Sequence, residues 1–176
     1  MFNRNRFWAI ALALMTALSV MGFSLGALIS VNAQTEQPTN YQDPAGRFEV
    51  ALLPEYKVTP VAGMFVVESP DSQIAYTVSV RPKAADAYLA DTDLAQFALE
   101  TVEKGEGFQA GVSEGTDIGV KIPWQGMLGK SPLSGMLFAR QTNNTVLILT
   151  LSAVEESKDK LAEILPELSQ SLKPLA

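Results

Sequence analysis

The sequence predicts an α+β domain: a central, mostly antiparallel sheet flanked by helices on both faces. Three observations lead to this prediction. Several segments alternate apolar and polar side chains with the period of a strand, most clearly Ile74–Arg81. Two others, near Leu94–Val102 and Leu161–Leu172, repeat apolar residues at helical spacing. Finally, Val146–Leu151 is apolar on both faces, as in a strand that is covered on each side.

The composition is that of a globular chain and excludes several classes of chemistry. Of the 176 residues, 47% are hydrophobic and 18% are charged, which suits one folded domain rather than a disordered chain. The sequence contains no cysteine and no histidine, which removes disulfides, cysteine nucleophiles, Ser-His-Asp triads and the usual zinc sites. The net charge of −6 disfavours nucleic acid as a partner. We therefore expect no cofactor and no bound metal.

Residues 1–33 are predicted to form a signal peptide or a membrane anchor. Arg4 and Arg6 precede a long apolar stretch that carries no charge before Glu36, and 31–33 (Val-Asn-Ala) ends it with small residues. The stretch is long enough to span a membrane, so retention as an anchor helix is the alternative to cleavage. Both outcomes place the rest of the chain outside the cytoplasm, soluble or anchored, because the arginines stay inside. An exported chain without cysteine fits a bacterial compartment.

Cleavage after Ala33 is expected to leave Gln34 as the mature N-terminus, because Ala33 completes the small-residue pattern. Mass-spectrometric sequencing of the N-terminus checks this prediction. An intact Met1 or Phe2 would show instead that the segment is retained and contacts the membrane.

The first half of the chain after the export segment is predicted to be a linker followed by strands. Residues 34–42 are polar and aperiodic, as in a flexible linker, and the single domain is expected to occupy residues 43–176. Prolines and turn residues bound the strands. The expected strands are Phe48–Leu53, a short piece near Lys57–Thr59, Met64–Glu68 and Ile74–Arg81.

The second half is predicted to contain two helices and a hairpin. The first helix should run from about Asp93 to Lys104, with Gly105 as its C-cap. After weaker extended runs in 107–128, a hairpin is expected with Asn143-Asn144 as its turn. The last helix should start near Ser157, and Pro166 is expected to kink or restart it.

Three residues are candidate partner contacts. Trp124 and Gln125 lie in a stretch rich in glycine and proline, where an exposed aromatic favours contact with a partner. The alternative is a core tryptophan that covers a sheet edge. Arg140, inside a hydrophobic strand, should either pair with a carboxylate or face a groove.

Two other functions stay open. A carboxylate-dependent hydrolase would need two acidic side chains that converge in one cleft. Helix capping accounts for Asp91 and Asp93, and a solvated helix face accounts for Glu100 and Glu103. We therefore expect no enzyme. A carrier of lipids or small molecules outside the cytoplasm would instead need a closed apolar cavity.

The order of the elements resembles that of the PsbP-like lumenal proteins and the DcrB-like bacterial lipoproteins. The resemblance starts with the turn, Gly-aromatic strand and proline of 41–54 and covers Tyr41–Ala176. It implies a sheet between helices, an exported location in the periplasm or thylakoid lumen, no catalytic residues, and often an accessory role at a membrane complex such as photosystem II. Tyr56 stands near a position where such proteins often carry tryptophan, and the histidines of their metal sites are missing. The expected function is therefore an exported, non-enzymatic accessory or binding module that acts at a membrane-proximal protein complex.

Overall fold

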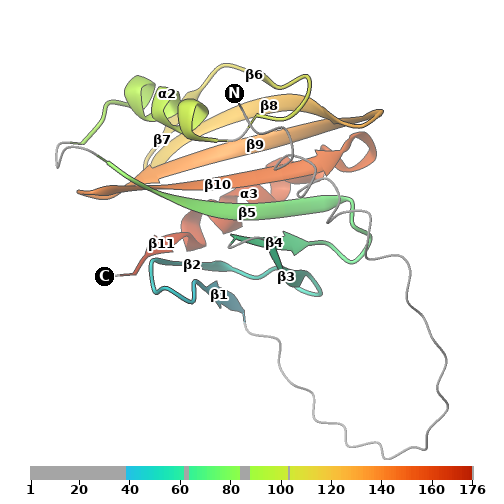
Figure 1. Ribbon diagram of the computed structural model, residues 1–176, viewed down its shortest axis with the longest axis horizontal. Coiled ribbons are helices and arrows are strands. Elements are labelled where there is room, and N and C mark those ends of the chain that lie inside the picture. Colours follow the sequence, from blue (N-terminus) through green and yellow to red (C-terminus); the bar gives the residue numbers. More distant parts are fainter. Residues whose placement is uncertain (1–38, 62–63, 84–87, 103, 176) are drawn as a thin grey trace, which may run out of the picture.

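The computed structural model describes residues 39–61, 64–83, 88–102 and 104–175, which form two antiparallel sheets and two α-helices. The expected signal or anchor helix of residues 1–33 lies outside the described residues. The large sheet has the order β3-β4-β5-β10-β9-β8-β6, with β7 also paired to β8 (Figure 1). Its strands are β3 (Lys57–Val61), β4 (Met64–Glu68), β5 (Ile74–Pro82), β6 (Gln109–Ala110), β7 (Glu114–Thr116), β8 (Gly119–Leu128), β9 (Ser131–Gln141) and β10 (Thr145–Val154).

A small second sheet joins the two ends of the described chain. Its order is β1-β2-β11, and its strands are β1 (Asn40–Gln42), β2 (Phe48–Ala51) and β11 (Lys173–Pro174). The predicted linker of residues 34–42 is therefore wrong at its C-terminal end, because Asn40–Gln42 pair with β2. The backbone hydrogen bonds of this pairing do not depend on apolar periodicity, which the polar segment lacks.

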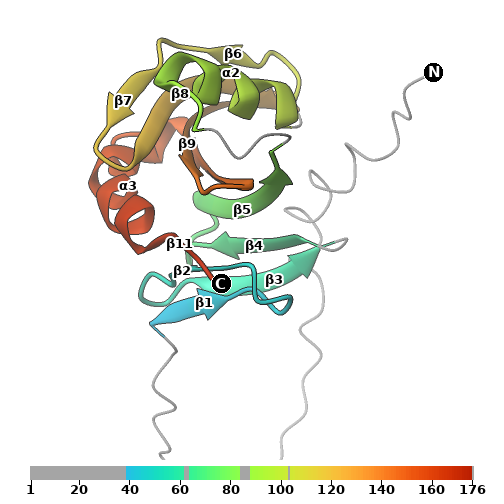
Figure 2. The ribbon, with the colours of Figure 1, turned by 90° about the vertical axis from the view of Figure 1, so that its left-hand side faces the viewer.

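The helices lie on opposite faces of the large sheet, as predicted (Figure 2). Helix α2 (Asp91–Thr101) contacts β8 and β9, whereas α3 (Lys160–Ser171) contacts β2, β9 and β10. A 3₁₀ turn, η2 (Glu155–Ser157), precedes α3. No helix among the described residues is long and apolar enough to cross a membrane.

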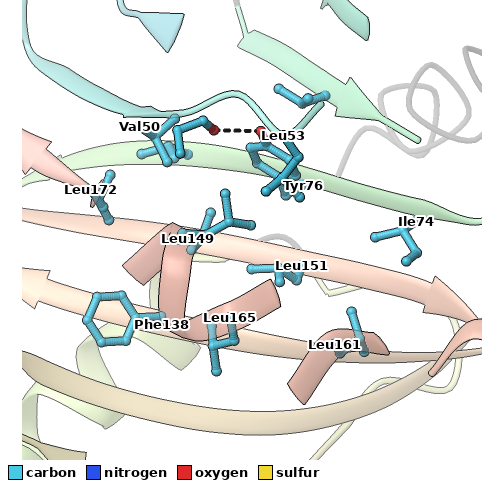
Figure 3. Close-up of a cluster of buried hydrophobic side chains, with 14 of the residues drawn as sticks. Val50, Leu53, Ile74, Tyr76, Phe138, Leu149, Leu151, Leu161, Leu165 and Leu172 are labelled. Atoms are coloured by element: carbon cyan, nitrogen blue, oxygen red, sulfur yellow. Dashed lines mark hydrogen bonds between the residues drawn. The ribbon is translucent and has the colours of Figure 1, made fainter. Parts of the chain in front are cut away.

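Strand β10 lies at the centre of the large sheet and is buried on both faces. Val146 and Ile148 pack in the cluster under α2, and Leu147, Leu149 and Leu151 pack in the cluster under α3. This confirms the interpretation of the two-sided apolar pattern. Figure 3 shows the α3-side core, in which the Tyr76 hydroxyl donates a hydrogen bond of 2.7 Å to the carbonyl of Ala51 in β2.

Several element boundaries differ from the predictions for local reasons. Helix α2 starts two residues earlier than predicted and ends at Thr101 instead of Lys104. Helix α3 continues through Pro166. Proline lacks the N–H that would bond to the carbonyl of Ala162 one turn earlier. Ala162 is exposed, so water can solvate this carbonyl instead. The hairpin turn at Asn143-Asn144 is confirmed, although neither asparagine has a positive φ.

Candidate functional site

A hollow lies where the small sheet meets the β3–β5 end of the large sheet. We call it the inter-sheet groove. It has a volume of about 670 Å³ and is bordered by the β1–β2 turn, the β3–β4 hairpin and the second half of β5. The lining residues used below are Asp43, Arg47, Val58, Met64, Val80 and Arg81.

The groove exists because β4 separates from β5 after a short pairing. The register of these two strands comprises Val67↔Tyr76 and Glu68↔Ala75. Beyond this point the hydroxyl of Thr77 donates a hydrogen bond of 2.6 Å to the Phe65 carbonyl. The Phe65 carbonyl, which would be the next acceptor for the β5 backbone, thus accepts a side-chain hydroxyl, and the pairing of β4 with β5 ends there.

The floor of the groove is aromatic and apolar. Tyr41 of β1 stacks on Phe65 of β4 with ring centroids 4.1 Å apart, and Phe65 in turn stacks on Phe48 of β2 at 5.7 Å. These contacts join the two sheets across the groove. Val58 and Met64 line it and are each 37% exposed, so the groove presents apolar surface to solvent.

The charged side of the groove is formed by two arginines and one aspartate. Arg47 Nε lies 2.6 Å from Asp43 Oδ2, and Arg47 Nη2 lies 3.0 Å from Oδ1, a bidentate pair. The Asp43 side chain is 6% exposed, whereas that of Arg47 is 50% exposed. Two of the three arginines among the described residues, Arg47 and Arg81, line this groove.

The Asp43–Arg47 pair should make the domain sensitive to acid. Hydrogen bonds from the Arg47 side chain hold the pKa of Asp43 below its usual range. The stabilisation is therefore complete above the ordinary carboxyl pKa of about 3.9 and is lost as the pH falls through the lower folded-state pKa. Asp43→Asn should lower the melting temperature near neutral pH and flatten the stability profile below about pH 4. Thermal unfolding of both proteins over this range is the measurement, and parallel profiles would contradict the expectation.

A second hollow of about 530 Å³, which we call the Gln125 hollow, lies between the β6–β8 edge and α3. Gln125 lines it together with Lys158, Leu161 and Ala162. Gln125 is exposed, so it can contact a partner. Successive side chains of a strand point to opposite faces, so Trp124 directs its ring to the α2 side.

Trp124 is half-buried and packs within the fold. Its ring stacks on Phe108, with centroids 5.7 Å apart, and joins the cluster under α2. It also lies against Gly135 of β9, its partner in the strand register. Its Nε1 atom is buried and has no hydrogen-bond partner among the described residues. The indole is therefore partly packed within the fold and partly exposed.

Arg140 is engaged within the fold. Its Nη1 donates a hydrogen bond of 2.8 Å to the carbonyl of Leu172, the C-cap of α3. The arginine thus satisfies a free carbonyl at a helix end, a third possibility beside the carboxylate pair and the groove considered from the sequence. Trp124 and Gln125 both line the Gln125 hollow, although their side chains start from opposite faces of β8. Arg140 does not line this hollow and bonds to the end of α3 instead, so the three residues do not form one patch.

One shallow hollow of about 280 Å³ contains two carboxylates, Glu55 and Asp71. A hydrogen bond from the Ser69 hydroxyl lowers the pKa of Asp71, which is opposite to the shift that a general acid needs near neutral pH. Among the described residues, no group of three or more acidic side chains is arranged to hold a metal ion.

The groove could not be found by inspecting motifs. Its residues come from four separate segments, and the features that create it are the end of a strand pairing and a side-chain hydrogen bond. The sequence signals nearest to it are the turn cluster of 43–46 and Pro82, which by themselves indicate a turn and a strand end.

No family model matches the chain, and no curated protein matches it in sequence. Solved structures do match. The solution structure of cyanobacterial PsbP (CyanoP) from Synechocystis sp. PCC 6803 has a TM-score of 0.57 at 16% identity and covers 85% of this chain and 98% of CyanoP. The crystal structure of LpqN, which is involved in cell envelope biogenesis of Mycobacterium tuberculosis, has a TM-score of 0.53 at 10% identity and covers 78% and 90%. A Bacteroides thetaiotaomicron structure has a TM-score of 0.50 at 14% identity, covering 78% of this chain and 48% of that one. The chain therefore shares the fold of CyanoP and LpqN over most of its length, which confirms the resemblance at the level of fold.

Proposed function

We propose that the protein is an extracytoplasmic, non-enzymatic binding module that holds a segment of a membrane-proximal protein in the inter-sheet groove. The observation that carries the proposal is the groove itself. It combines exposed apolar side chains, Val58 and Met64, with arginines at the point where β4 leaves β5. Surfaces that bind proteins combine an apolar centre with polar groups at the rim.

The cellular setting of the proposal comes from the N-terminal sequence and from the matching folds. Residues 1–33 read as an export signal or anchor. LpqN is described as acting in cell envelope biogenesis, and CyanoP is a cyanobacterial PsbP. The partner then belongs to a membrane-proximal complex of the periplasm or, in a photosynthetic cell, of the thylakoid lumen, where photosystem II is the natural candidate.

The face of the Trp124–Leu128 segment that carries Gln125 and Met127 is a secondary contact proposal. Gln125 is exposed and Met127 is 37% exposed, the same fraction as Met64 in the groove. These two methionines form a matched pair, because they offer equal exposure on two different surfaces.

Site-specific photocrosslinking distinguishes the two surfaces. A photoreactive phenylalanine analogue replaces Met64 in one variant and Met127 in the other, in cells that produce the full chain. The proposal predicts a discrete membrane-associated adduct from position 64 and little from position 127. An adduct from position 127 alone would move the contact to the Trp124–Leu128 face, and equal adducts from both would contradict a specific groove.

A further inference from the structure

We propose that the groove binds its partner as an extended, acidic peptide segment, which adds as a new strand to the free edge of β5 at Val78 and Val80. This inference deepens the proposed function and rests on it. It assigns the ligand class, which is a peptide in strand conformation that carries carboxylates. It also names the backbone groups of β5 that recognise this peptide.

The hydrogen bonds around β5 show which way its backbone groups point. The carbonyl of Ile74 accepts a bond of 2.9 Å from Ser69, on the β4 side. Lys83 N–H instead donates a bond of 2.8 Å to Asn144, on the β10 side. Successive residues of a strand direct their N–H and C=O groups to alternate sides. The even-numbered residues Val78 and Val80 therefore direct both groups away from β10 and toward the groove.

No strand of the described part of the chain pairs with β5 on this side beyond Tyr76. The register with β4 ends at Val67↔Tyr76, and the Phe65 carbonyl, next in line for Val78, accepts the Thr77 hydroxyl instead. Pro82 ends the open stretch, because the N–H that proline lacks would also have pointed toward the groove. Proline is tolerated in a strand where the missing donor faces away from a partner strand. The open edge is thus short and suits a short added strand.

The chemistry around this edge selects the occupant. Val58 and Met64 offer apolar contacts to alternate side chains of an added strand. The Arg47 guanidinium lines the groove and is half-exposed, so a ligand in the groove can reach it. Arg47 uses Nε and Nη2 on Asp43, which leaves its other N–H groups for a second carboxylate. An acidic segment is therefore preferred to a basic one.

The test uses a blocked pentapeptide, Glu-Val-Thr-Val-Glu, titrated into the isotope-labelled protein and followed by amide chemical shifts. Four matched peptides are compared: the parent, one with both glutamates changed to lysine, and two that carry a single N-methyl group on adjacent central residues. A strand bonds through alternate N–H groups, so one methylated peptide should lose at least about tenfold in affinity and the other should bind like the parent. The lysine peptide should bind more weakly than the parent at low salt.

The outcomes separate this inference from the proposed function. Saturable shifts at Val78 and Val80, with alternation between the methylated peptides, support strand addition. Binding in the groove that is indifferent to both methyl groups overturns strand addition and leaves the groove as a binding site. The absence of any binding by the four peptides also overturns it, and the crosslink at position 64 then decides separately on the groove. Shifts confined to the Gln125 hollow would contradict both.

Two variants at one position add a test on the protein side. Val80→Pro removes the N–H that faces the groove, whereas Val80→Ala shortens the side chain and keeps the N–H. Strand addition predicts that the proline variant loses at least about tenfold in affinity for the parent peptide and that the alanine variant keeps most of it. Equal affinities for two folded variants would overturn the inference. If Val80→Pro does not fold, the methylated peptides on the unchanged protein carry the test.

Discussion

Replacement of Leu149 by alanine is expected to lower the free energy of unfolding by about 2–5 kcal/mol, the usual range for a fully buried leucine. Leu149 is 0% exposed in the middle of β10 and lies between Phe138 and Val78 in the strand register. Its neighbours belong to a rigid sheet and to α3, so the cavity left behind cannot collapse fully. Urea unfolding monitored by circular dichroism measures the change.

The adjacent residue provides a second arm of the same test. Ile148 is also 0% exposed but packs in the cluster under α2. Ile148→Ala should therefore cost a similar amount, because β10 is covered on both faces. Val112→Ala serves as the control, since Val112 is 87% exposed and should change stability by less than about 0.5 kcal/mol. A large loss at Leu149 with almost none at Ile148 would mean that one face of the sheet is open.

Introduction of a single methyl group at Gly135 is expected to destabilise the domain by about 1–3 kcal/mol. A Cβ atom at this position would lie 2.0 Å from Cε2 and 2.3 Å from Nε1 of Trp124. The indole would have to leave its place against β9, which would also disturb its stacking on Phe108. Thermal and urea unfolding of Gly135→Ala give the cost.

A double-mutant cycle assigns this cost to the tryptophan. In a Trp124→Ala background the methyl group meets no ring, so Gly135→Ala should be nearly neutral and the coupling free energy should exceed about 1 kcal/mol. Additive effects would contradict the packing of the ring on Gly135. In a Trp8→Phe background Trp124 is the remaining tryptophan, and its emission should shift to the red when Gly135 becomes alanine.

The parts of the fold that the sequence predicted correctly are those with strong local periodicity. The two-sided apolar pattern of β10 required cover on both faces, and α2 and α3 supply it. The Asn143-Asn144 turn was found because a tight turn leaves a local signature. These signals depend on neighbours along the chain, which are visible without a structure.

The parts that it missed depend on distant contacts. Strand β1 is polar, and it is ordered by pairing with β2 and by the stacking of Tyr41 on Phe65. The two-residue strand β11 is too short for a pattern and is placed by β2. The inter-sheet groove follows from the early end of the β4–β5 pairing, where the Thr77 hydroxyl donates a hydrogen bond to the Phe65 carbonyl.

The candidate contact residues show the same limit. A tryptophan in a glycine-rich stretch suggested a surface loop, but glycine at 135 is what makes room for the ring of Trp124 across the strand pair. Arg140 carries a charge inside a hydrophobic strand, and the acceptor that explains it, the Leu172 carbonyl, lies 32 residues along the chain. The composition of the strand could not identify this acceptor.

Residue-resolved amide hydrogen exchange of the unliganded protein tests the open edge of β5 most directly. The account predicts alternation: the amides of Ser79 and Arg81, on the β10 side, should exchange slowly, and those of Val78 and Val80, on the groove side, should exchange much faster. Tyr76, which still pairs with β4, should be protected like the odd-numbered residues. Equal, strong protection of all five amides would show that the edge is already covered and would contradict the central claim that β5 is free to accept a strand.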